Sequence, residues 1–449
     1  SWLVFSSNHE GTTKFYALEL GIDDAKPMEI KGLNGFCSFS QTNSEVYAFS
    51  RGTVYKVDLN SHSSSKIDVK QDINVDIRNE FRQMFYESWA ALEENYYDPR
   101  HHNTDWRAVR DRYAAHLSDI QTRGQLSTLI TDMLGEINSS HLGFSSTAKE
   151  AHTATSVTTQ ETGIVFSENS PYIVDRILPF SPADKVEIDV AKGDKLVAVD
   201  GKRVDSKANR NIYFTAPGSK KEISLTFDRK GKERTFKVHT CTVSEYKNLL
   251  YTEWEDECRS RVDKKSNGRV AYIHMRDMQD GSLNSFMRDL YTYAYDKDAL
   301  ILDLRYNNGG NVHKEVLDML RSFAPFKWSY RDYPKVGHPN VAPGEKTIIC
   351  LVNEHSLSDA EVTSNGIKTL GIAKIVGTET YRWIIFTSSV GLIDGSSCRM
   401  PAWGCYNLEG EDLEHTGVKP DVYVRNTFKD RLMGNDPQLD KAIEMALGK

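Results

Sequence analysis

The alternation of hydrophobic and polar positions divides the chain into four stretches of different periodicity. In residues 1–75, apolar and polar side chains alternate in short runs that clusters of Gly, Asn, Asp and Ser separate. A two-residue period predicts β-strands, and strands at this spacing are typical of a sandwich, a barrel or a propeller. The stretch GTVYKVDL favours the propeller, and 75 residues are enough for one to two blades of about 40–50 residues each.

From about residue 78 the period becomes that of a helix. Apolar side chains in three consecutive stretches recur on one helical face, at the spacing i, i+3, i+4, i+7. These side chains are Phe81, Met84, Phe85, Trp89, Leu92, Tyr96, Trp106, Val109, Tyr113, Leu117, Leu126, Leu129, Ile130, Met133 and Ile137. Core packing is the simplest interpretation of these stripes, so residues 76–155 are predicted to form a small helical domain.

The last two stretches differ in how strands and helices follow one another. Residues 156–245 return to short strands, and ILPFSPADKVEIDVAKGDKLVAVDGKRV resembles the core of a PDZ domain, which binds an extended peptide at a sheet edge. Residues 246–449 alternate strands with helices, which predicts an α/β domain with partly parallel strands. The predicted fold class is multidomain α+β and α/β, with partial β-propeller blades, a small helical domain, a PDZ-like β domain and an α/β catalytic domain.

Composition and charge narrow the classes of partner. The net charge is −7 and no dense Lys/Arg run occurs, so nothing points to nucleic acid. The apolar runs are far shorter than the ~20 residues that cross a bilayer, so no membrane insertion is expected. Six scattered cysteines without a CxxC pair favour a reducing compartment, and we expect a cytoplasmic location. A periplasmic location stays open because the chain begins without Met, as a fragment or processed form would.

Ser358 occupies a position that suits a nucleophile. The apolar run TIICLV (347–352) predicts a buried strand, and SDAEVTSNGIKTLG predicts a helix that begins beside Ser358. The positive end of the helix dipole would lie at this serine, at the carboxyl end of a strand, where α/β sheets place their active sites. An ordinary helix cap would occupy the same position. Ser358 therefore needs partners before it can be interpreted as a nucleophile.

One partner of a serine nucleophile is an oxyanion hole. The sequence LDLRYNNGGNV (302–312) places two glycines directly after a second predicted strand. Glycine lets a backbone N–H approach a ligand closely, because no side chain intervenes. The amides of Gly310 and Asp359 are predicted to bind a developing oxyanion together. A glycine turn that merely starts a helix would produce the same pattern.

The other partners are a base and a group that orients it. His141, in EINSSHLGFSS, stands out among the 13 histidines because of its polar context at the end of the helical domain. The hydroxyl of Ser140 could hold one imidazole nitrogen while the other faces the nucleophile. Glu414, in LEHTGVKPDV, could in turn accept from Ser140.

Taken together, these segments resemble the tricorn protease family, within the larger group of tail-specific (C-terminal processing) serine peptidases. The matching segments, in order, are YYDPRHHNTDWRAVRDRY, GEINSSHLGF, DLRYNNGGNV, NEHSLSDAE and LEHTGVKPDV. The resemblance implies that Ser358 is the nucleophile and His141 the general base, with Ser140 and Glu414 completing a Ser–His–Ser–Glu relay. The implied domain order is propeller remnant, helical domain carrying the base, PDZ-like domain and serine peptidase domain, at residues 1–75, 76–155, 156–245 and 246–449.

The resemblance also implies an activity and an assembly. The implied activity is a serine endopeptidase that degrades unfolded proteins or peptides without a metal or cofactor, in a ring-like homo-oligomer such as a hexamer. A Ser–Lys dyad is disfavoured, because Trp383 occupies the lysine position and no lysine lies between Lys374 and Lys419. No HExxH motif occurs, and the histidine pair at 101–102 is interpreted as a surface loop, so no metal site is predicted.

The segment Tyr381-Arg382-Trp383 departs from the family's pattern, which tends to have a Gly-rich turn here. Its bulky side chains could narrow or block the substrate groove. The alternative interpretation is therefore a catalytically impaired PDZ-type protein that binds peptides. For specificity, the resemblance implies a preference for basic or hydrophobic residues before the cut, with an acidic side chain in the segment after the double glycine. Asp332 is the candidate for that side chain, and an aromatic pocket is the alternative; the sequence does not identify the natural substrate.

Overall fold

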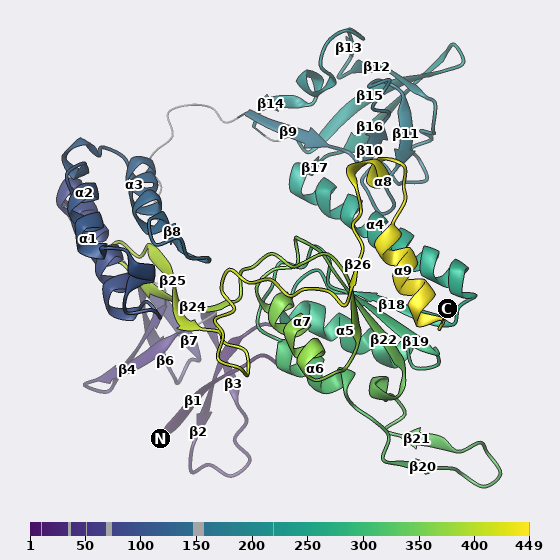
Figure 1. Cartoon of the computed structure of the whole chain (residues 1–449). Helices are drawn as coiled ribbons and strands as arrows, with labels where there is room; N and C mark the ends of the chain where they lie inside the picture. The colour runs from purple at the N-terminus through teal and green to yellow at the C-terminus, as the bar shows by residue number, and fades with distance from the viewer. Residues whose placement is uncertain are drawn as a thin grey trace. The chain divides into compact units, whose positions relative to one another are not determined.

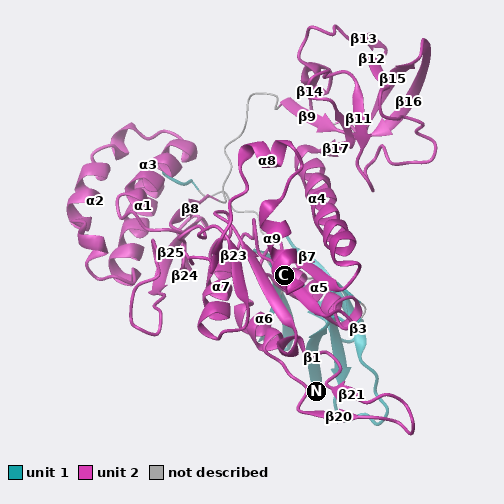
Figure 2. Cartoon of the chain, turned by 45° about the vertical axis from the view of Figure 1, so that its right-hand side comes forward, with its two compact units in different colours: residues 1–76 teal, residues 77–449 magenta. Residues whose placement is uncertain are grey.

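The computed structural model describes residues 1–9, 11–34, 37–50, 52–68, 74–146, 157–218 and 220–448 (Figure 1). The chain divides into two compact units, residues 1–76 and residues 77–449 (Figure 2). The predicted boundary at residues 155/156 lies outside the described residues, and the predicted boundary at 245/246 falls within the first turn of a long helix. No helix among the described residues has both the length and the apolar character that crossing a bilayer requires.

The first unit is a single sheet of seven strands, ordered β1-β2-β3-β7-β6-β5-β4. The strands are β1 Trp2–Ser7, β2 Lys14–Glu19, β3 Met28–Asn34, β4 Ser38–Thr42, β5 Glu45–Ser50, β6 Thr53–Asp58 and β7 Ser63–Ile67. Strands β4 to β7 form a four-stranded antiparallel meander, which is the pattern of a propeller blade. A parallel pairing of Lys31 with Ser63 joins this meander to β1–β3. Those three strands form part of a second antiparallel meander.

The second unit begins with the predicted helices, α1 Ile77–Asn95, α2 Trp106–Ala114 and α3 Arg123–Gly135. Their apolar stripes form one core, as the helical period predicts. The core also contains side chains from a distant hairpin, formed by β24 (Ile385–Gly391) and β25 (Ser397–Gly404). Strand β8 (Gly143–Ser145) extends this hairpin, and the sheet order is β24-β25-β8. The helical domain is therefore completed by residues that the sequence assigned to the α/β domain.

The β-rich segment that follows forms three small sheets, and two of them supply the strand residues of one apolar core. The sheets are β13-β12-β15-β16, β10-β11 and β14-β9-β17. Their strands are β9 Val157–Glu161, β10 Ile164–Phe166, β11 Val174–Ile177, β12 Lys195–Val199, β13 Lys202–Arg203, β14 Thr215–Pro217, β15 Glu222–Arg229, β16 Lys232–His239 and β17 Cys241–Thr242.

The α/β domain is built on five parallel strands in the order β18-β19-β22-β23-β26. The strands are β18 Val270–His274, β19 Ala299–Asp303, β22 Thr347–Val352, β23 Lys374–Gly377 and β26 Val422–Tyr423. Three helices cover one face, α5 Asp280–Thr292, α6 His313–Leu320 and α7 Asp359–Thr369. The other face packs on α4 Val243–Ser266 and α9 Pro437–Ala446.

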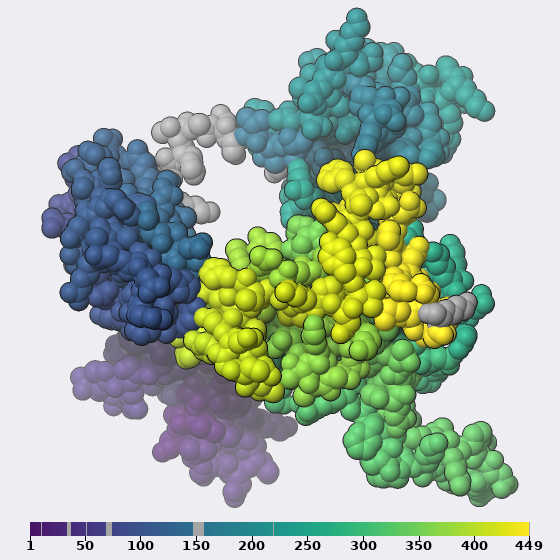
Figure 3. All heavy atoms as spheres, viewed as in Figure 1, coloured from purple at the N-terminus to yellow at the C-terminus, as the bar shows by residue number. Residues whose placement is uncertain are grey.

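Burial on both faces explains the unbroken apolar runs of the central strands. All five residues of β19 are buried, and they alternate between the two cores. The other elements include the short helix α8 (Phe428–Leu432) and a small ribbon, β20 (Phe326–Trp328) with β21 (Val336–His338). Four short 3-10 helices are η1 His101–Asn103, η2 Leu117–Asp119, η3 Arg210–Tyr213 and η4 Pro343–Glu345. The residues between β20 and β21 extend away from the sheet, as the green projection in Figure 3 shows.

Candidate active site

Ser358 lies on a sharp turn between β22 and α7. Its backbone has φ +57° and ψ −120°, a conformation that residues with a side chain rarely adopt. Strained turns of this kind occur where a strand presents a nucleophile at the start of a helix. Position and conformation therefore both favour a functional serine over an ordinary helix cap.

A buried carboxylate that the sequence analysis missed holds this turn. Glu361 is 0% exposed and accepts a hydrogen bond from the amide of Ser358, at 3.0 Å. It also accepts from the amides of Arg382 (2.7 Å) and Trp383 (2.8 Å) and from the hydroxyl of Thr380 (2.6 Å). Burial raises the pKa of Glu361, and these donors oppose that rise. The unusual segment at 381–383 thus ties its backbone to the serine turn.

The imidazole of His141 meets this serine. His141 Nε2 lies 2.9 Å from Ser358 Oγ, and His141 Nδ1 lies 2.9 Å from the hydroxyl of Ser140. Burial lowers the pKa of His141 to about 4; the charge of Arg399 adds to the decrease and that of Glu414 opposes it. A neutral imidazole at ordinary pH can accept the serine proton through Nε2 while Nδ1–H donates to Ser140.

Glu414 supports the histidine segment differently from the predicted contact. Its Oε1 accepts from the backbone amide of Ser140, at 2.6 Å, and from the hydroxyl of Ser139, at 2.7 Å. Among the side-chain hydrogen bonds of the described residues, none joins Glu414 to the Ser140 hydroxyl. Oε2 accepts from Tyr97, at 2.9 Å. The carboxylate therefore fixes the backbone beneath His141, and Ser139 and Tyr97 are partners that the sequence analysis did not name.

The glycines after β19 have to be glycines. At Gly310 a Cβ atom would lie 2.0 Å from the carbonyl oxygen of Met278, and at Gly309 it would lie 2.6 Å from Cβ of Ser358. Gly309 also has φ +77°, which favours glycine. Within the described part of the chain, the amides of Gly310 and Asp359 donate to no protein acceptor. Both are thus available to a ligand beside Ser358.

The side chain of Asp359 joins the two strand ends. Its carboxylate accepts from the amides of Val312 (2.8 Å) and His313 (3.0 Å), at the start of α6. It also bonds Nδ1 of His313 at 2.6 Å, and this hydrogen bond raises the pKa of His313. The loop that carries Gly310 is therefore fixed to the helix that follows Ser358.

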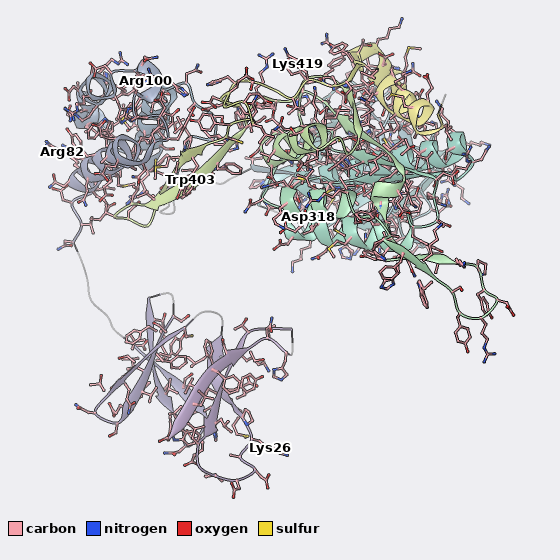
Figure 4. The ribbon with its side chains drawn as sticks, turned by 60° about the horizontal axis from the view of Figure 1, so that its bottom comes forward. Lys26, Arg82, Arg100, Asp318, Trp403 and Lys419 are labelled. Atoms are coloured by element: carbon pink, nitrogen blue, oxygen red, sulfur yellow. The ribbon has the colours of Figure 1, made fainter. Side chains whose placement is uncertain are left out.

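A cavity of about 600 Å³ opens beside the serine. Its lining residues are Gly310, Asn311, Ser358, Asp359, Val362, Ile385, Phe386, Thr387, Arg399 and Trp403. Figure 4 labels Trp403 on the hairpin between the helices and the α/β domain. A larger cavity, of about 1060 Å³, lies between α4 and the C-terminal segment, and none of the residues predicted for catalysis lines it. The smaller cavity is therefore the candidate substrate site.

The residues predicted for specificity do not line this cavity. Asp332 is exposed, in the projecting segment between β20 and β21, so within this chain it lies outside the pocket. Arg382 directs its side chain to Glu379, at 3.0 Å. The ring of Trp383 packs beside His141, with 5.2 Å between the ring centroids. Arg399 and Trp403, which do line the cavity, come from the hairpin that the sequence did not connect with the site.

The histidine pair at 101–102 is not a surface loop, contrary to the sequence interpretation. His101 is 7% exposed, and His102 bonds Tyr97 at 2.9 Å and the carbonyl of Ile137 at 3.2 Å. Among the described residues, His102, Glu414 and His415 are the one group whose ligand atoms lie close enough to hold a metal ion, within 4.8 Å of one another. The hydroxyl of Tyr97 bonds both His102 Nε2 and Glu414 Oε2, so two members of this group belong to the hydrogen-bonded network beneath His141.

Comparison with known families matches three parts of the chain. Residues 269–424 match peptidase family S41, residues 77–135 match the tricorn protease C1 domain, and residues 153–240 match the PDZ domain. The predicted combination of a helical domain, a PDZ-like domain and an α/β peptidase domain is confirmed.

Individual relatives match along most of the chain. Tricorn protease homolog 1 of Streptomyces coelicolor is 29% identical over 90% of this chain and 39% of its own length. The tricorn protease of Thermoplasma volcanium is 26% identical over 99% of this chain and 44% of its own. The chain thus spans less than half the length of these curated relatives. A crystal structure of the tricorn protease shares the fold, with a TM-score of 0.80 and 23% identity over 99% of this chain and 45% of that one. A putative tricorn-like protease C-terminal subunit of Sulfurisphaera tokodaii is 30% identical over 84% of this chain and 44% of its own length. The chain therefore belongs to the tricorn protease family, and its residues 269–424 match peptidase family S41.

Proposed function

We propose that this chain carries a working serine endopeptidase centre in which Ser358 is the nucleophile and His141 the general base. The observation that supports this most is the 2.9 Å contact between His141 Nε2 and Ser358 Oγ, beside the unpaired amides of Gly310 and Asp359. Nucleophile, base and oxyanion donors are the three parts that acyl transfer requires in one place. They come from the helical domain and from two strand ends of the α/β domain.

The arrangement suits a two-step acyl transfer. Ser358 Oγ would attack the carbonyl carbon of the scissile peptide bond while His141 takes its proton. The negative charge on the carbonyl oxygen would be held by the amides of Gly310 and Asp359. The imidazolium would then give its proton to the leaving amine, and a water molecule would repeat the sequence on the acyl-enzyme. In this scheme Ser140 and Glu414 are positioning residues, because they act through the histidine and its backbone.

An active-site probe tests the proposal directly. A fluorophosphonate should label the folded wild-type protein and should not label Ser358→Ala, since the probe reports a nucleophilic serine. Ser206→Ala is the matched control, because this serine is exposed in a turn of the PDZ-like domain. His141→Ala should lose labelling and peptide cleavage by about 10³-fold or more. An unlabelled wild type at pH 7, with an intact fold by circular dichroism, would refute the proposal.

Absence of fluorophosphonate labelling would instead favour the alternative, a catalytically impaired protein that binds peptides. It rests on the bulky segment at 381–383, and Trp383 does pack on His141. That contact leaves the cavity beside Ser358 open, because none of residues 381–383 lines it. Peptide binding that is unaffected by Ser358→Ala, together with no cleavage, would support the alternative. The unfolded-protein substrate and the ring-like assembly, such as a hexamer, are further proposals that analytical ultracentrifugation and digestion of unfolded proteins can test.

A further inference from the structure

The cavity beside Ser358 is lined by a positively charged residue, Arg399, that has no role in the proposed mechanism. Of its lining residues, only Arg399 and Asp359 carry a formal charge. The carboxylate of Asp359 is occupied by the amides of Val312 and His313 and by the His313 imidazole. The charge of Arg399 is consequently the one that a molecule in this cavity would meet.

Arg399 is an exposed arginine of β25, and among the described residues it has no carboxylate partner, unlike Arg305 and Arg229. Arg305 is buried between Asp303 and Asp436, and Arg229 pairs with Asp194 at 2.6 Å. Within the described part of the chain, Arg399 forms no ion pair and donates from Nε to the hydroxyl of Thr387, at 3.1 Å. Desolvation lowers the pKa of Arg399, while the residue as a whole stays exposed to solvent. An uncompensated guanidinium beside a reacting centre is a natural binding group for an anion.

The position of Arg399 places this charge next to the chemistry. On β25, Arg399 pairs with Gly143 of β8, two residues beyond His141. Its charge contributes to the lowered pKa of His141, so the two groups are within electrostatic reach. Val362, Ile385, Phe386 and Trp403 add apolar surface to the same cavity. Such surface suits the aliphatic part of a peptide, and the guanidinium suits a carboxylate attached to it.

We propose that Arg399 binds a carboxylate of the peptide next to the scissile bond, a proposal that rests on the peptidase function above. The carboxylate could belong to an Asp or Glu side chain or to the C-terminus of the peptide, since both offer the same planar pair of oxygens to a guanidinium. The substrate class is then an acidic or C-terminal peptide segment. This differs from the preference for basic or hydrophobic residues that the family resemblance implied, with Asp332 as the candidate acidic side chain.

Matched peptides distinguish the two sources of the carboxylate. One pair, both amidated at the C-terminus, carries Glu or Gln on either side of the cut. A second pair carries Gln there and ends in a free acid or an amide. For the wild type, we expect kcat/KM to be at least about tenfold higher for the carboxylate-bearing member of one pair, as a charge-assisted hydrogen bond would give. A preference in the first pair identifies a side chain, and one in the second identifies the C-terminus.

Variants then assign the preference to Arg399. The ratio of kcat/KM values should fall to about one in Arg399→Gln and below one in Arg399→Glu. Arg399→Lys should keep part of it, because lysine retains the charge but not the planar fork. Arg425→Gln, which removes an exposed arginine outside the cavity, should behave as wild type. Equal values within both pairs, or a ratio that Arg399→Gln leaves unchanged, would overturn the proposal.

Labelling by fluorophosphonate separates this proposal from the peptidase function. Labelling does not require a substrate carboxylate, so Arg399→Gln should still be labelled, whatever its ratio of kcat/KM between paired peptides. Labelling without any preference between paired peptides would overturn the role of Arg399 and leave the peptidase function standing. Absence of labelling in the wild type would remove the peptidase function, and this proposal with it.

Discussion

The two sides of the candidate active site are built in different ways. On the nucleophile side, residues that follow β19 and β22 bond one another within the α/β domain. Buried Asn307 donates to the carbonyl of Met275 and accepts from the amide of Gly309, and Ser356 donates to the carbonyl of Leu304. On the base side, Glu414 reaches a backbone 274 residues earlier in the chain. The first side is held by neighbouring strand ends, whereas the second is assembled from distant segments.

This difference shows what fixes the position of the catalytic groups on each side of the site. Parallel strand ends are fixed by the sheet, so the serine turn and the glycine loop need only local hydrogen bonds. The histidine is fixed by the pairing of β8 with β25 and by one buried carboxylate. Changes to the residues that hold the serine turn should therefore act on a rigid frame and be severe, whereas changes to the residues that hold the histidine should be graded. Three predictions test this comparison.

The largest effect is expected from Gly310→Ala on the nucleophile side. The added Cβ would lie 2.0 Å from the carbonyl oxygen of Met278, which is backbone and cannot move aside easily. Displacement of one oxyanion donor should lower kcat by about 10²–10³-fold. Gly281→Ala in α5 is the matched control, since a Cβ there meets nothing within 4 Å. Stopped-assay kinetics on a labelled peptide measure both variants, and near-normal kcat in Gly310→Ala would show that the loop is not rigid.

A smaller effect is expected from Glu414→Gln on the base side. The amide group keeps the shape of the carboxylate, but its NH₂ cannot accept from Tyr97 if its oxygen accepts from Ser139 and Ser140. A loosened histidine segment should lower kcat by about 10–100-fold and leave KM little changed, as a positional shift would. A full loss of activity, equal to that of His141→Ala, would contradict the graded behaviour expected for this side. Glu409→Gln, at an exposed position, provides the control.

The same contrast explains how much the sequence could predict. Ser358 and the double glycine were identified from apolar runs that end in polar residues, because strand ends carry their signal locally. His141, Ser140 and Glu414 were identified through family resemblance. The structure places His141 against Ser358 and Ser140 against His141, whereas Glu414 bonds the Ser140 backbone and not the predicted hydroxyl. The sequence around Arg399 and Trp403 did not indicate a place in the site. No pattern within β24 and β25 shows that these strands pack on helices about 300 residues earlier. Asp332 was placed in the pocket through a loose alignment, and it lies in the exposed segment between β20 and β21.

The smallest effect is expected in the pH dependence of kcat/KM. This dependence reports whether the histidine side and the serine side remain in contact in solution. The pKa of His141 is lowered to about 4 from an ordinary 6.5, first by burial and then by Arg399. Because the base must be neutral, kcat/KM should rise as pH passes about 4 and stay level above about 5. An imidazole exposed by separation of the two sides would instead give a rise near its ordinary pKa of about 6.5.

The free energy of unfolding should also decrease as pH falls toward the pKa of His141. Between pH 6.5 and 4 the unfolded chain binds the His141 proton and the folded chain does not, so unfolding becomes easier as pH falls through this window. Arg399→Gln removes the second cause of the lowered pKa, and the acid limb of kcat/KM should then move to higher pH. A peptide without carboxylates is needed for this measurement, because a substrate carboxylate would titrate in the same range. An acid limb that stays in place in Arg399→Gln would mean that burial alone sets the pKa of His141, and that the hairpin holds its arginine farther from the base than the structure indicates.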